Sequence, residues 1–206
     1  MNRPILIGVV GLARSGKDTA ADYLAKELRL YKYAFAEPLK TMLKSVFGDH
    51  FHTGDRGGIC PETQVTYRKM MQTLGTEWGR SLHPDIWVNL VDRKWRWVQE
   101  GCPFELEYLE GTARNVKFGN EPVTAGMVIS DLRFDSEAWW LKNQGGILLE
   151  IRRGKPATKP WWKFWSRTHE SERGISEGFE RYVIHNDGNL EQLYRQIDGF
   201  IERRVR

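Results

Sequence analysis

Residues 5–19 read Ile5-Leu6-Ile7-Gly8-Val9-Val10-Gly11-Leu12-Ala13-Arg14-Ser15-Gly16-Lys17-Asp18-Thr19, and this stretch decides the fold. The apolar run at its start is typical of a parallel strand that is buried on both faces. Gly11, Gly16 and Lys17 follow with the spacing G-x-x-x-x-G-K of a phosphate-binding loop. In such a loop, backbone N–H groups surround phosphate oxygens and the following helix adds a favourable dipole. The residue after the lysine departs from the usual Ser or Thr, because it is Asp18, with Thr19 one position later.

Strands and helices alternate along the rest of the chain. Further strands are predicted at 31–36, 127–131, 147–151 and 182–184. Helices are predicted at 17–28, 38–47, 66–74, 85–99, 136–144 and 190–203, with Gly75 as the stop of the third. This alternation indicates an α/β fold, a P-loop NTPase-like parallel sheet wound on both sides by helices, with a lid segment. We expect a single domain over 1–206, with a hairpin insertion at 101–126 and a lid at about 152–175.

Composition and charge limit the classes of protein to which the chain can belong. Its 206 residues include 31 Lys and Arg against 27 Asp and Glu, and a net charge of +4 is too mild to imply nucleic-acid binding by itself. The two cysteines, Cys60 and Cys102, lack the spacing of a metal site, which favours a reduced compartment. No apolar stretch is long enough to span a membrane, and the first residues lack a signal-peptide pattern. We therefore expect a cytoplasmic protein.

A carboxylate marks the end of the strand predicted at 127–131. Ligands of open α/β sheets bind beyond the carboxyl ends of the strands, so Asp131 and Arg133 are expected in the same cleft as the phosphate loop. Asp131 would help to hold Mg²⁺ through water or orient a phosphate, and Arg133 would bind a phosphate with two hydrogen bonds. Glu137, one helical turn further, would face the same pocket. The alternative is an Asp–Arg surface pair that caps a helix, and the phosphate loop in the same chain favours the functional interpretation.

The helix predicted at 66–74 carries another set of polar side chains. Arg68 and Gln72 are four residues apart and therefore share one helix face. An arginine there can clamp a monophosphate, and a glutamine amide can pair with the edge of a base. Trp78 or Trp87 is available to stack on that base. Taken alone, the segment is equally compatible with an ordinary amphipathic helix whose neighbouring tryptophans belong to the core.

A basic segment, 152–173, holds seven Lys or Arg and only two Glu. Four of its arginines would bring positive charge to a transferring phosphoryl group when a lid closes: Arg152, Arg153, Arg167 and Arg173. The tryptophans between them would alternatively form a nucleic-acid surface.

Several blocks of sequence occur in an order known from one enzyme family. They are residues 11–19, Phe35-Ala36-Glu37-Pro38-Leu39-Lys40, Gln72-Thr73-Leu74-Gly75-Thr76-Glu77-Trp78-Gly79-Arg80, Asp85-Ile86-Trp87-Val88, Ser130-Asp131-Leu132-Arg133-Phe134 with Glu137, and His169-Glu170-Ser171-Glu172. Together they resemble the bacteriophage-type deoxynucleoside monophosphate kinases, a branch of the P-loop kinase superfamily. The resemblance covers nearly the whole chain, with 101–126 matched least, and the family shares the Asp18 departure.

The resemblance implies transfer of the γ-phosphoryl group of ATP to a deoxynucleoside 5′-monophosphate, with Mg²⁺ as cofactor. Small-molecule nucleotides would be the partners, without nucleic acid or membrane, and a homodimer is compatible. Helices within about 37–100 would bind the acceptor, and a phage source would place the enzyme in the host cytoplasm.

The residues that the resemblance assigns fall into four groups. The ATP and phosphate site would comprise Gly11, Arg14, Ser15, Gly16, Lys17, Asp18 and Thr19. The acceptor site would comprise Ser15, Asp18, Thr19, Arg68, Lys69, Gln72, Gly75, Thr76, Trp87, Asp131, Arg133 and Glu137. Catalysis would fall to Lys17, Lys69, Arg68, Asp131 and Arg133. Mg²⁺ would lie beside Asp18 and Thr19.

Two other functions stay open on the sequence. Another small-molecule P-loop kinase, of the phosphomevalonate or dephospho-coenzyme A type, would share the fold and differ in its acceptor, although Gln72 and the nearby tryptophans favour a base. A nucleic-acid-stimulated P-loop ATPase would use 152–173 as its surface. Against it, Asp131 is followed by Leu-Arg and not by the second acidic residue common in ATPase motors. The spacing does not decide which bases are accepted or whether ribonucleotides are excluded.

Overall fold

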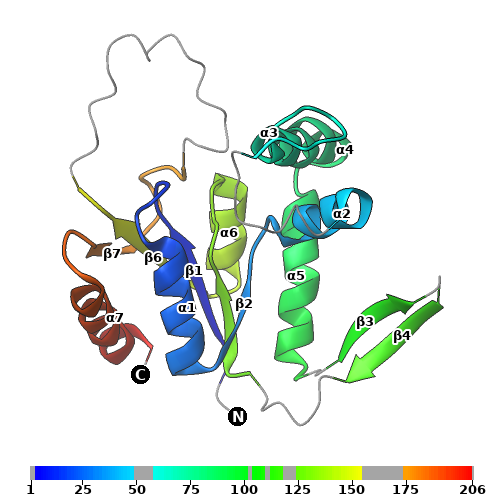
Figure 1. Cartoon of the computed structure of the whole chain (residues 1–206). Helices are drawn as coiled ribbons and strands as arrows, with labels where there is room; N and C mark the ends of the chain where they lie inside the picture. The colour runs from blue at the N-terminus through cyan, green and yellow to red at the C-terminus, as the bar shows by residue number, and fades with distance from the viewer. Residues whose placement is uncertain are drawn as a thin grey trace, which may run out of the picture.

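The computed structural model describes residues 3–48, 58–101, 124–154 and 174–205, together with the backbone of 104–109 and 112–117. Its centre is a five-stranded sheet in the order β2-β5-β1-β6-β7, and every neighbouring pair in it is parallel (Figure 1). Helices flank both faces of this sheet. The predicted fold class is confirmed.

The strands are short and mainly apolar, and the phosphate loop follows the C-terminal end of β1. They are β1 (Ile5–Val10), β2 (Leu30–Tyr33), β5 (Gly126–Ile129), β6 (Ile147–Arg152) and β7 (Tyr182–His185). β1 is central, with Ile7 opposite Val128 of β5 and Gly8 opposite Leu148 of β6. Because β1 has a strand on each side and helices on each face, all of it but Ile5 is buried. This burial accounts for an apolar run without polar alternation.

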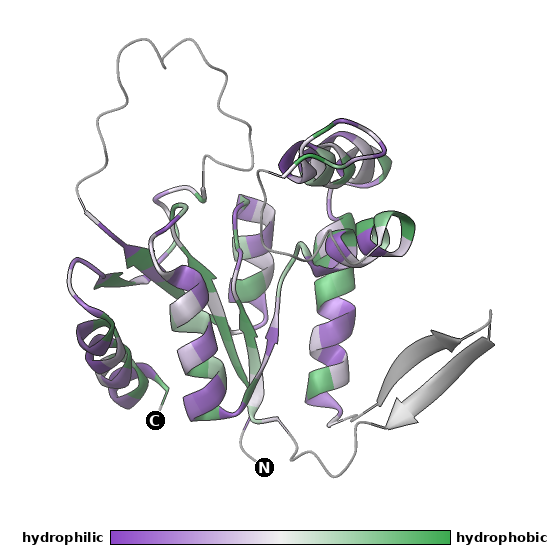
Figure 2. Cartoon of the chain, in the orientation of Figure 1, coloured by the Kyte–Doolittle hydropathy of each residue, from purple (hydrophilic) through white to green (hydrophobic). Residues whose placement is uncertain are grey.

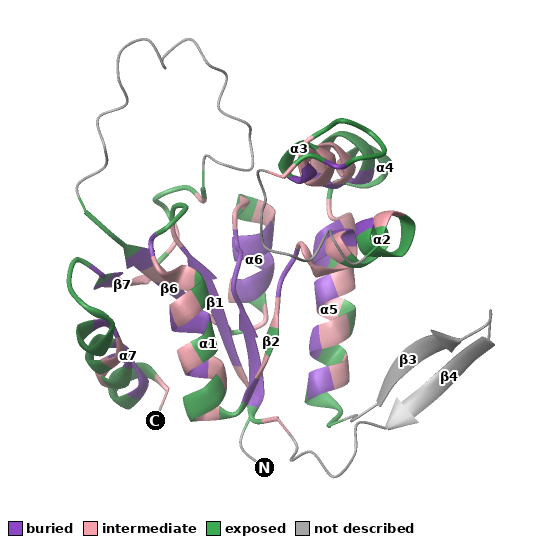
Figure 3. Cartoon of the chain, viewed as in Figure 1, coloured by how far each residue is buried: buried purple, intermediate pink, exposed green. Residues whose placement is uncertain are grey.

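The helices on the two faces close two separate cores. α1 (Lys17–Leu28) and α7 (Leu190–Arg204) pack on one face, in a cluster that includes Ile7 and Leu24. α5 (Ile86–Gln99) and α6 (Asp135–Asn143) pack on the other, in a cluster that includes Trp95 and Leu141. Figures 2 and 3 show that the apolar strands are also the buried ones, and that exposed positions gather on the outer sides of the helices. None of the helices in the described part of the chain combines the length and apolarity needed to cross a bilayer.

Shorter helices connect β2 to α5 beyond the C-terminal ends of the strands (Figure 1). They are α2 (Glu37–Phe47), α3 (Tyr67–Gln72), a π-helix (Thr73–Gly79) and α4 (Arg80–Leu82). Within the segment 101–126, β3 (Phe104–Leu109) and β4 (Thr112–Lys117) pair with each other as an antiparallel hairpin. The short helices place polar side chains opposite the phosphate loop, whereas the hairpin extends away from it.

The strand predicted at 31–36 is too long, because β2 ends at Tyr33. The next N–H groups in the chain, those of Phe35 and Ala36, donate to the Asp131 carboxylate instead of to a neighbouring strand. Sequence periodicity could not reveal these two hydrogen bonds, because the accepting carboxylate lies almost a hundred residues further along the chain.

The prediction that Gly75 stops a helix is also wrong, because the π-helix continues through it to Gly79. The Gly75 carbonyl accepts a hydrogen bond of 2.7 Å from Trp87 Nε1. A Cβ at Gly79 would lie 2.2 Å from Cζ2 of the same indole. Gly79 therefore permits close packing against Trp87, Gly75 contacts the same indole through its carbonyl, and neither glycine ends the helix.

Trp95 is fully buried in the α5–α6 core, and its indole N–H has no hydrogen-bond partner. We expect Trp95→Ala to lower the free energy of unfolding by about 3–5 kcal/mol, because it leaves a large cavity. The matched control is Trp139→Ala, since Trp139 is 61% exposed on α6. The control should cost less than about 1 kcal/mol, because surface substitutions usually change stability little. Urea denaturation followed by circular dichroism measures both, and equal losses would contradict the assigned core.

Candidate active site

The loop after β1 has the backbone of an anion-binding turn. Arg14 and Gly16 have left-handed φ angles of 65° and 93°. The Ala20 N–H donates to the Gly16 carbonyl at 2.9 Å, so α1 begins directly at Lys17. The N–H groups of the first turn have no acceptor within the helix and are available to phosphate oxygens.

Asn186 stabilises this loop through a side-chain hydrogen bond. It follows β7, is buried, and donates from Nδ2 to the Ser15 carbonyl at 2.8 Å. Its own N–H donates to the Arg152 carbonyl at 2.6 Å, which joins it to the end of β6. A Cβ at position 16 would lie 2.3 Å from Asn186 Nδ2, so glycine is required there by space as well as by φ. The sequence analysis did not identify Asn186, because Asn-Asp-Gly after a strand is typical of an ordinary turn.

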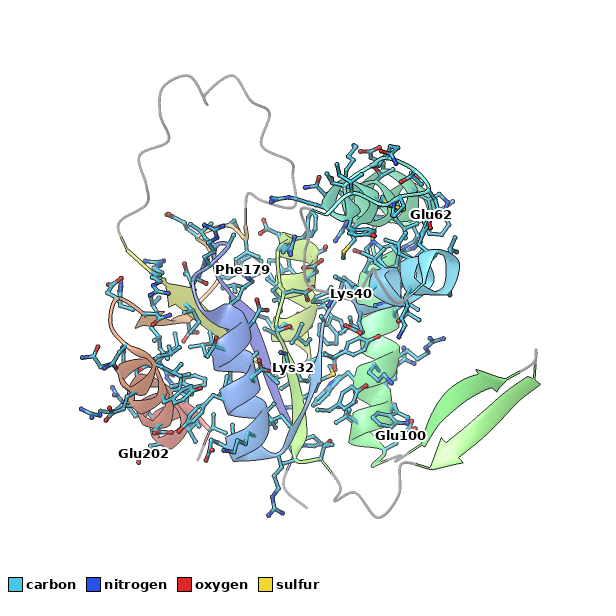
Figure 4. The ribbon with its side chains drawn as sticks, in the orientation of Figure 1. Lys32, Lys40, Glu62, Glu100, Phe179 and Glu202 are labelled. Atoms are coloured by element: carbon cyan, nitrogen blue, oxygen red, sulfur yellow. The ribbon has the colours of Figure 1, made fainter. Side chains whose placement is uncertain are left out.

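A cavity of about 560 Å³ extends from the phosphate loop to α2, α3 and the start of α6. Its charged lining comes from segments that are far apart in the sequence. The cations are Lys17, Lys40, Arg68, Arg80, Arg133 and Arg181, and the anions are Asp18, Asp131, Glu137 and Glu150 (Lys40 is labelled in Figure 4). The excess of positive charge suits a ligand that carries phosphate groups.

Asp131 lies in the cavity wall, just beyond β5, and both of its oxygens are engaged. Oδ1 accepts the Phe35 N–H at 2.7 Å, and Oδ2 accepts the Ala36 N–H at 3.0 Å. The residue is 9% exposed. It therefore fixes the turn between β2 and α2, and its expected contact with Mg²⁺ or a phosphate stays a prediction.

Glu137 is 2% exposed, and it accepts hydrogen bonds at both oxygens. Oε2 accepts the N–H groups of Arg133 at 2.8 Å and Phe134 at 3.2 Å, at the start of α6. Oε1 accepts Arg80 Nη2 at 2.8 Å. Burial raises the pKa of Glu137 to about 7 and the charge of Asp131 adds to the rise, whereas the backbone hydrogen bonds and the Arg80 charge act in the opposite direction.

Arg80 is held in a fixed orientation while it lines the cavity. Besides its pair with Glu137, its guanidinium lies 3.7 Å from the centroid of the Phe134 ring. Nη1 donates to the Pro84 carbonyl at 3.1 Å. These contacts leave the arginine preorganised for an anion on the cavity side.

Most of the other predicted acceptor residues line the cavity, whereas Ser15, Thr19 and Lys69 do not. Arg68, Gln72, Gly75 and Thr76 lie on its wall. Lys69 is not part of the lining: its Nζ donates to Glu77 at 2.7 Å, and both side chains are about half exposed.

Trp87 also belongs to the lining, but it is only 4% exposed. Its indole N–H is committed to the Gly75 carbonyl, so the ring supports the wall from within the core.

The lid residues are only partly described. Arg152 and Arg153 are exposed at the end of β6, and neither lines the cavity. Arg152 pairs instead with Glu150 at 2.8 Å. Arg167, Arg173 and the block 169–172 lie outside the described residues.

Glu150 and Arg181 belong to the cavity but were not identified from the sequence. Arg181 lies 3.3 Å from Glu150 and donates to the carbonyls of Phe179 and Ser176. Burial acts to raise the pKa of Glu150, but the hydrogen bond and charge of Arg152, together with those of Arg181, outweigh it and hold this pKa below its usual value. The only signal in the sequence was a glutamate in an otherwise apolar strand.

Oxygen atoms suited to a Mg²⁺-nucleotide lie around the first turn of α1. Asp18 lines the cavity, with Oδ2 at 3.7 Å from Lys17 Nζ. Ser15 Oγ is buried and finds no hydrogen-bond partner among the described residues, and Thr19 is partly buried. Among the described residues, no three His, Cys, Asp or Glu side chains gather into a metal site. Because Mg²⁺ often binds through one or two carboxylates with phosphate oxygens and water, this sparse set fits it.

Comparison with known proteins assigns the chain to a family. The family model described as deoxynucleotide monophosphate kinase matches residues 5–59 and 59–197. A relative from Acanthamoeba polyphaga mimivirus that bears the same family name is 30% identical over 210 residues, covering 96% of each chain. The deoxynucleotide monophosphate kinase of Enterobacteria phage T4 is 28% identical over 141 residues, covering 68% of this chain and 47% of the phage protein.

Among solved structures, the chain is similar to shikimate kinase from Aquifex aeolicus, with a TM-score of 0.44 and 12% identity over 98% of each chain. The family model and the mimivirus relative both span almost the whole chain, and the residues matched by the family model include every segment that lines the cavity. The chain belongs to the deoxynucleotide monophosphate kinase family.

Proposed function

We propose that this protein transfers the γ-phosphoryl group of ATP to a deoxynucleoside 5′-monophosphate, giving the diphosphate and ADP for DNA precursor synthesis. The observation that carries the proposal is the cavity of about 560 Å³ that joins the phosphate loop to an arginine-bearing wall, in a chain of this family. Two nucleotides that enter this cavity from opposite ends would bring the donor γ-phosphate and the acceptor phosphate together.

The donor end is built from the phosphate loop. Backbone N–H groups between Gly11 and Lys17 would surround the ATP phosphates, with the N-terminal end of α1 directed at them. The Lys17 side chain is only 11% exposed, and it would add a point charge at the β- and γ-phosphates.

The acceptor end is built from α3, the π-helix and the start of α6. Arg68 and Arg133 line the cavity and would hold the acceptor phosphate, together with Arg80, which is fixed by Glu137. Gln72 and Thr76 lie on the same wall and would contact the base. Lys69 would contribute only if its pair with Glu77 opened.

The chemistry requires position and charge more than a reactive side chain. Phosphoryl transfer between two oxygens proceeds in line, and a cavity of this kind catalyses it by alignment and by neutralising the charge on the transferring group. Mg²⁺ beside Asp18 and Thr19, when bound, would supply charge neutralisation at the donor phosphates. The phage and mimivirus relatives favour a viral source, which would place the reaction in the host cytoplasm.

The proposal is tested with a coupled ADP-release assay containing Mg·ATP and a panel of acceptors. The panel holds deoxynucleoside and ribonucleoside monophosphates, mevalonate phosphate, dephospho-coenzyme A and single-stranded DNA. Turnover is expected with one or more deoxynucleoside monophosphates, and a Lys17→Met variant should lose it, which excludes a contaminating kinase. Turnover only with DNA, or with none of the acceptors, would overturn the proposal.

Asp18→Ala should lower kcat by about tenfold or more while the affinity for ATP changes little. A carboxylate beside phosphates repels them, so removing it does not weaken donor binding, whereas its work on Mg²⁺ or the acceptor is lost. Asp22→Ala is the matched control, because Asp22 lies one turn further along α1 and pairs with Lys32 at 2.5 Å. Unchanged kcat in Asp18→Ala would remove this carboxylate from the site.

The pH dependence of acceptor use should follow Glu137. With its pKa raised to about 7, Glu137 is charged above that pH and neutral below it, so acidification weakens its pair with Arg80. We expect kcat/KM for the monophosphate to fall between pH 8 and pH 6. The phosphate groups of the substrates also titrate near pH 6, so the variant Glu137→Gln is the necessary comparison. The kcat/KM of this variant should be low already at pH 8, and its pH profile should lack the transition near pH 7. A profile like that of the wild type would contradict the role assigned to Glu137.

A further inference from the structure

A second cavity, of about 470 Å³, lies on the far side of α2 from the catalytic cavity and shares no lining residue with it. It is bounded by β2, α2 and α5, and we call it the β2–α2–α5 groove. Its lining includes Tyr31 and Tyr33 of β2, Thr41 and Met42 of α2, and Arg93 and Lys94 of α5. Its volume lies in the range of small-molecule sites.

One side of the groove is aromatic. Tyr31 and Tyr33 are two residues apart on a strand and therefore point to the same face. Their ring centroids are 6.0 Å apart with an angle of 24° between the planes, and Trp97 meets Tyr31 edge-on at 5.5 Å. Because β2 is an edge strand, these rings stand at the border of the sheet, and they pack against the core cluster to which α5 contributes. Figure 4 shows the side chains that fill the space between β2 and α5.

Two cations of α5 also line the groove, and one of them lies against the aromatic rings. Lys94 Nζ lies 4.6 Å from the Trp97 ring centroid and 5.3 Å and 5.8 Å from those of Tyr31 and Tyr33. Arg93 is exposed, and within the described part of the chain it makes no hydrogen bond or ion pair. Glu37 also lines the groove, and its carboxylate pairs with Lys40 at 3.3 Å.

We propose that the β2–α2–α5 groove binds a nucleotide at a site separate from the catalytic cavity. Planar rings beside two adjacent cations match a ligand with a flat base and attached phosphates. The base would lie on Tyr31 and Tyr33, and the phosphates would meet Arg93 and Lys94.

Helix α2 connects the two cavities. Leu39 and Lys40 line the catalytic cavity, whereas Pro38 and Thr41 line the groove. A nucleotide seated against α2 therefore changes the wall that the acceptor meets, and this part of the inference rests on the proposed function. Occupancy should shift KM for the acceptor and leave kcat nearly unchanged.

The test counts bound nucleotides by equilibrium dialysis with labelled dTTP, in the presence of saturating ADP and dGMP to fill the catalytic cavity. The variants are Arg93→Glu and the control Arg96→Glu, which lies on the same helix outside the groove and pairs with Asp92. We expect one dTTP per chain in the wild type and in Arg96→Glu. In Arg93→Glu the affinity should fall by about tenfold or more, because a repelling charge replaces an attracting one.

Kinetics provides the second readout. Without dTTP, all three proteins should share one kcat, and with dTTP the acceptor KM should shift in the wild type and in Arg96→Glu but not in Arg93→Glu. The inference is overturned if no additional dTTP binds, if Arg93→Glu binds it like the control, or if pyrophosphate displaces it with equal affinity. Loss of the proposed function is distinguishable, since the protein would then turn over no monophosphate while the dialysis result still decides the groove.

Discussion

The candidate active site depends on one buried carboxylate that accepts hydrogen bonds from the backbone of a neighbouring segment. Asp131 stands just beyond β5, and its two oxygens accept consecutive N–H groups of the turn that leads from β2 into α2. A buried carboxylate is stable only when such donors replace water, and the donors in turn have lost their strand partners. The contact therefore fixes where α2 starts relative to the sheet, and with it the distance between the phosphate loop and the opposite wall.

The opposite wall is made of helices too short to be stable alone, and polar contacts hold them to the rigid part of the fold. The Trp87 indole donates a hydrogen bond to the Gly75 carbonyl, and Glu137 at the start of α6 forms an ion pair with Arg80. Burial of the Glu137 carboxylate costs desolvation free energy, which is why its pKa is raised. Its hydrogen bonds offset part of this cost. An electrostatic network in the wall thus combines support of the helices with orientation of an arginine toward the cavity.

The sequence predicted the elements whose signals are local. The parallel sheet, the phosphate loop and most helices follow from apolar runs and from Gly-x-x-x-x-Gly-Lys, because neighbours in the chain produce those patterns. Asp131, Arg133 and Glu137 were placed at the cavity because strand ends gather on one edge of a sheet. Asn186, Glu150 and Arg181 could not be identified in this way, since the contacts that define them join segments far apart in the sequence. Lys69 illustrates the reverse: its neighbours on α3 line the cavity as predicted, but Lys69 pairs with Glu77 and is not part of the lining.

The π-helix at Thr73–Gly79 determines in which direction around the helix axis the side chains after it point, beginning with Arg80. A turn bonded from i to i+5 contains one residue more than an α-helical turn, so the side chains beyond it are rotated relative to an uninterrupted α-helix. One residue corresponds to about 100° of rotation in an α-helix. The orientation of Arg80 therefore depends on the number of residues that precede it: deletion of one residue that regularised this helix would retain all the other side chains and still turn Arg80 away from Glu137.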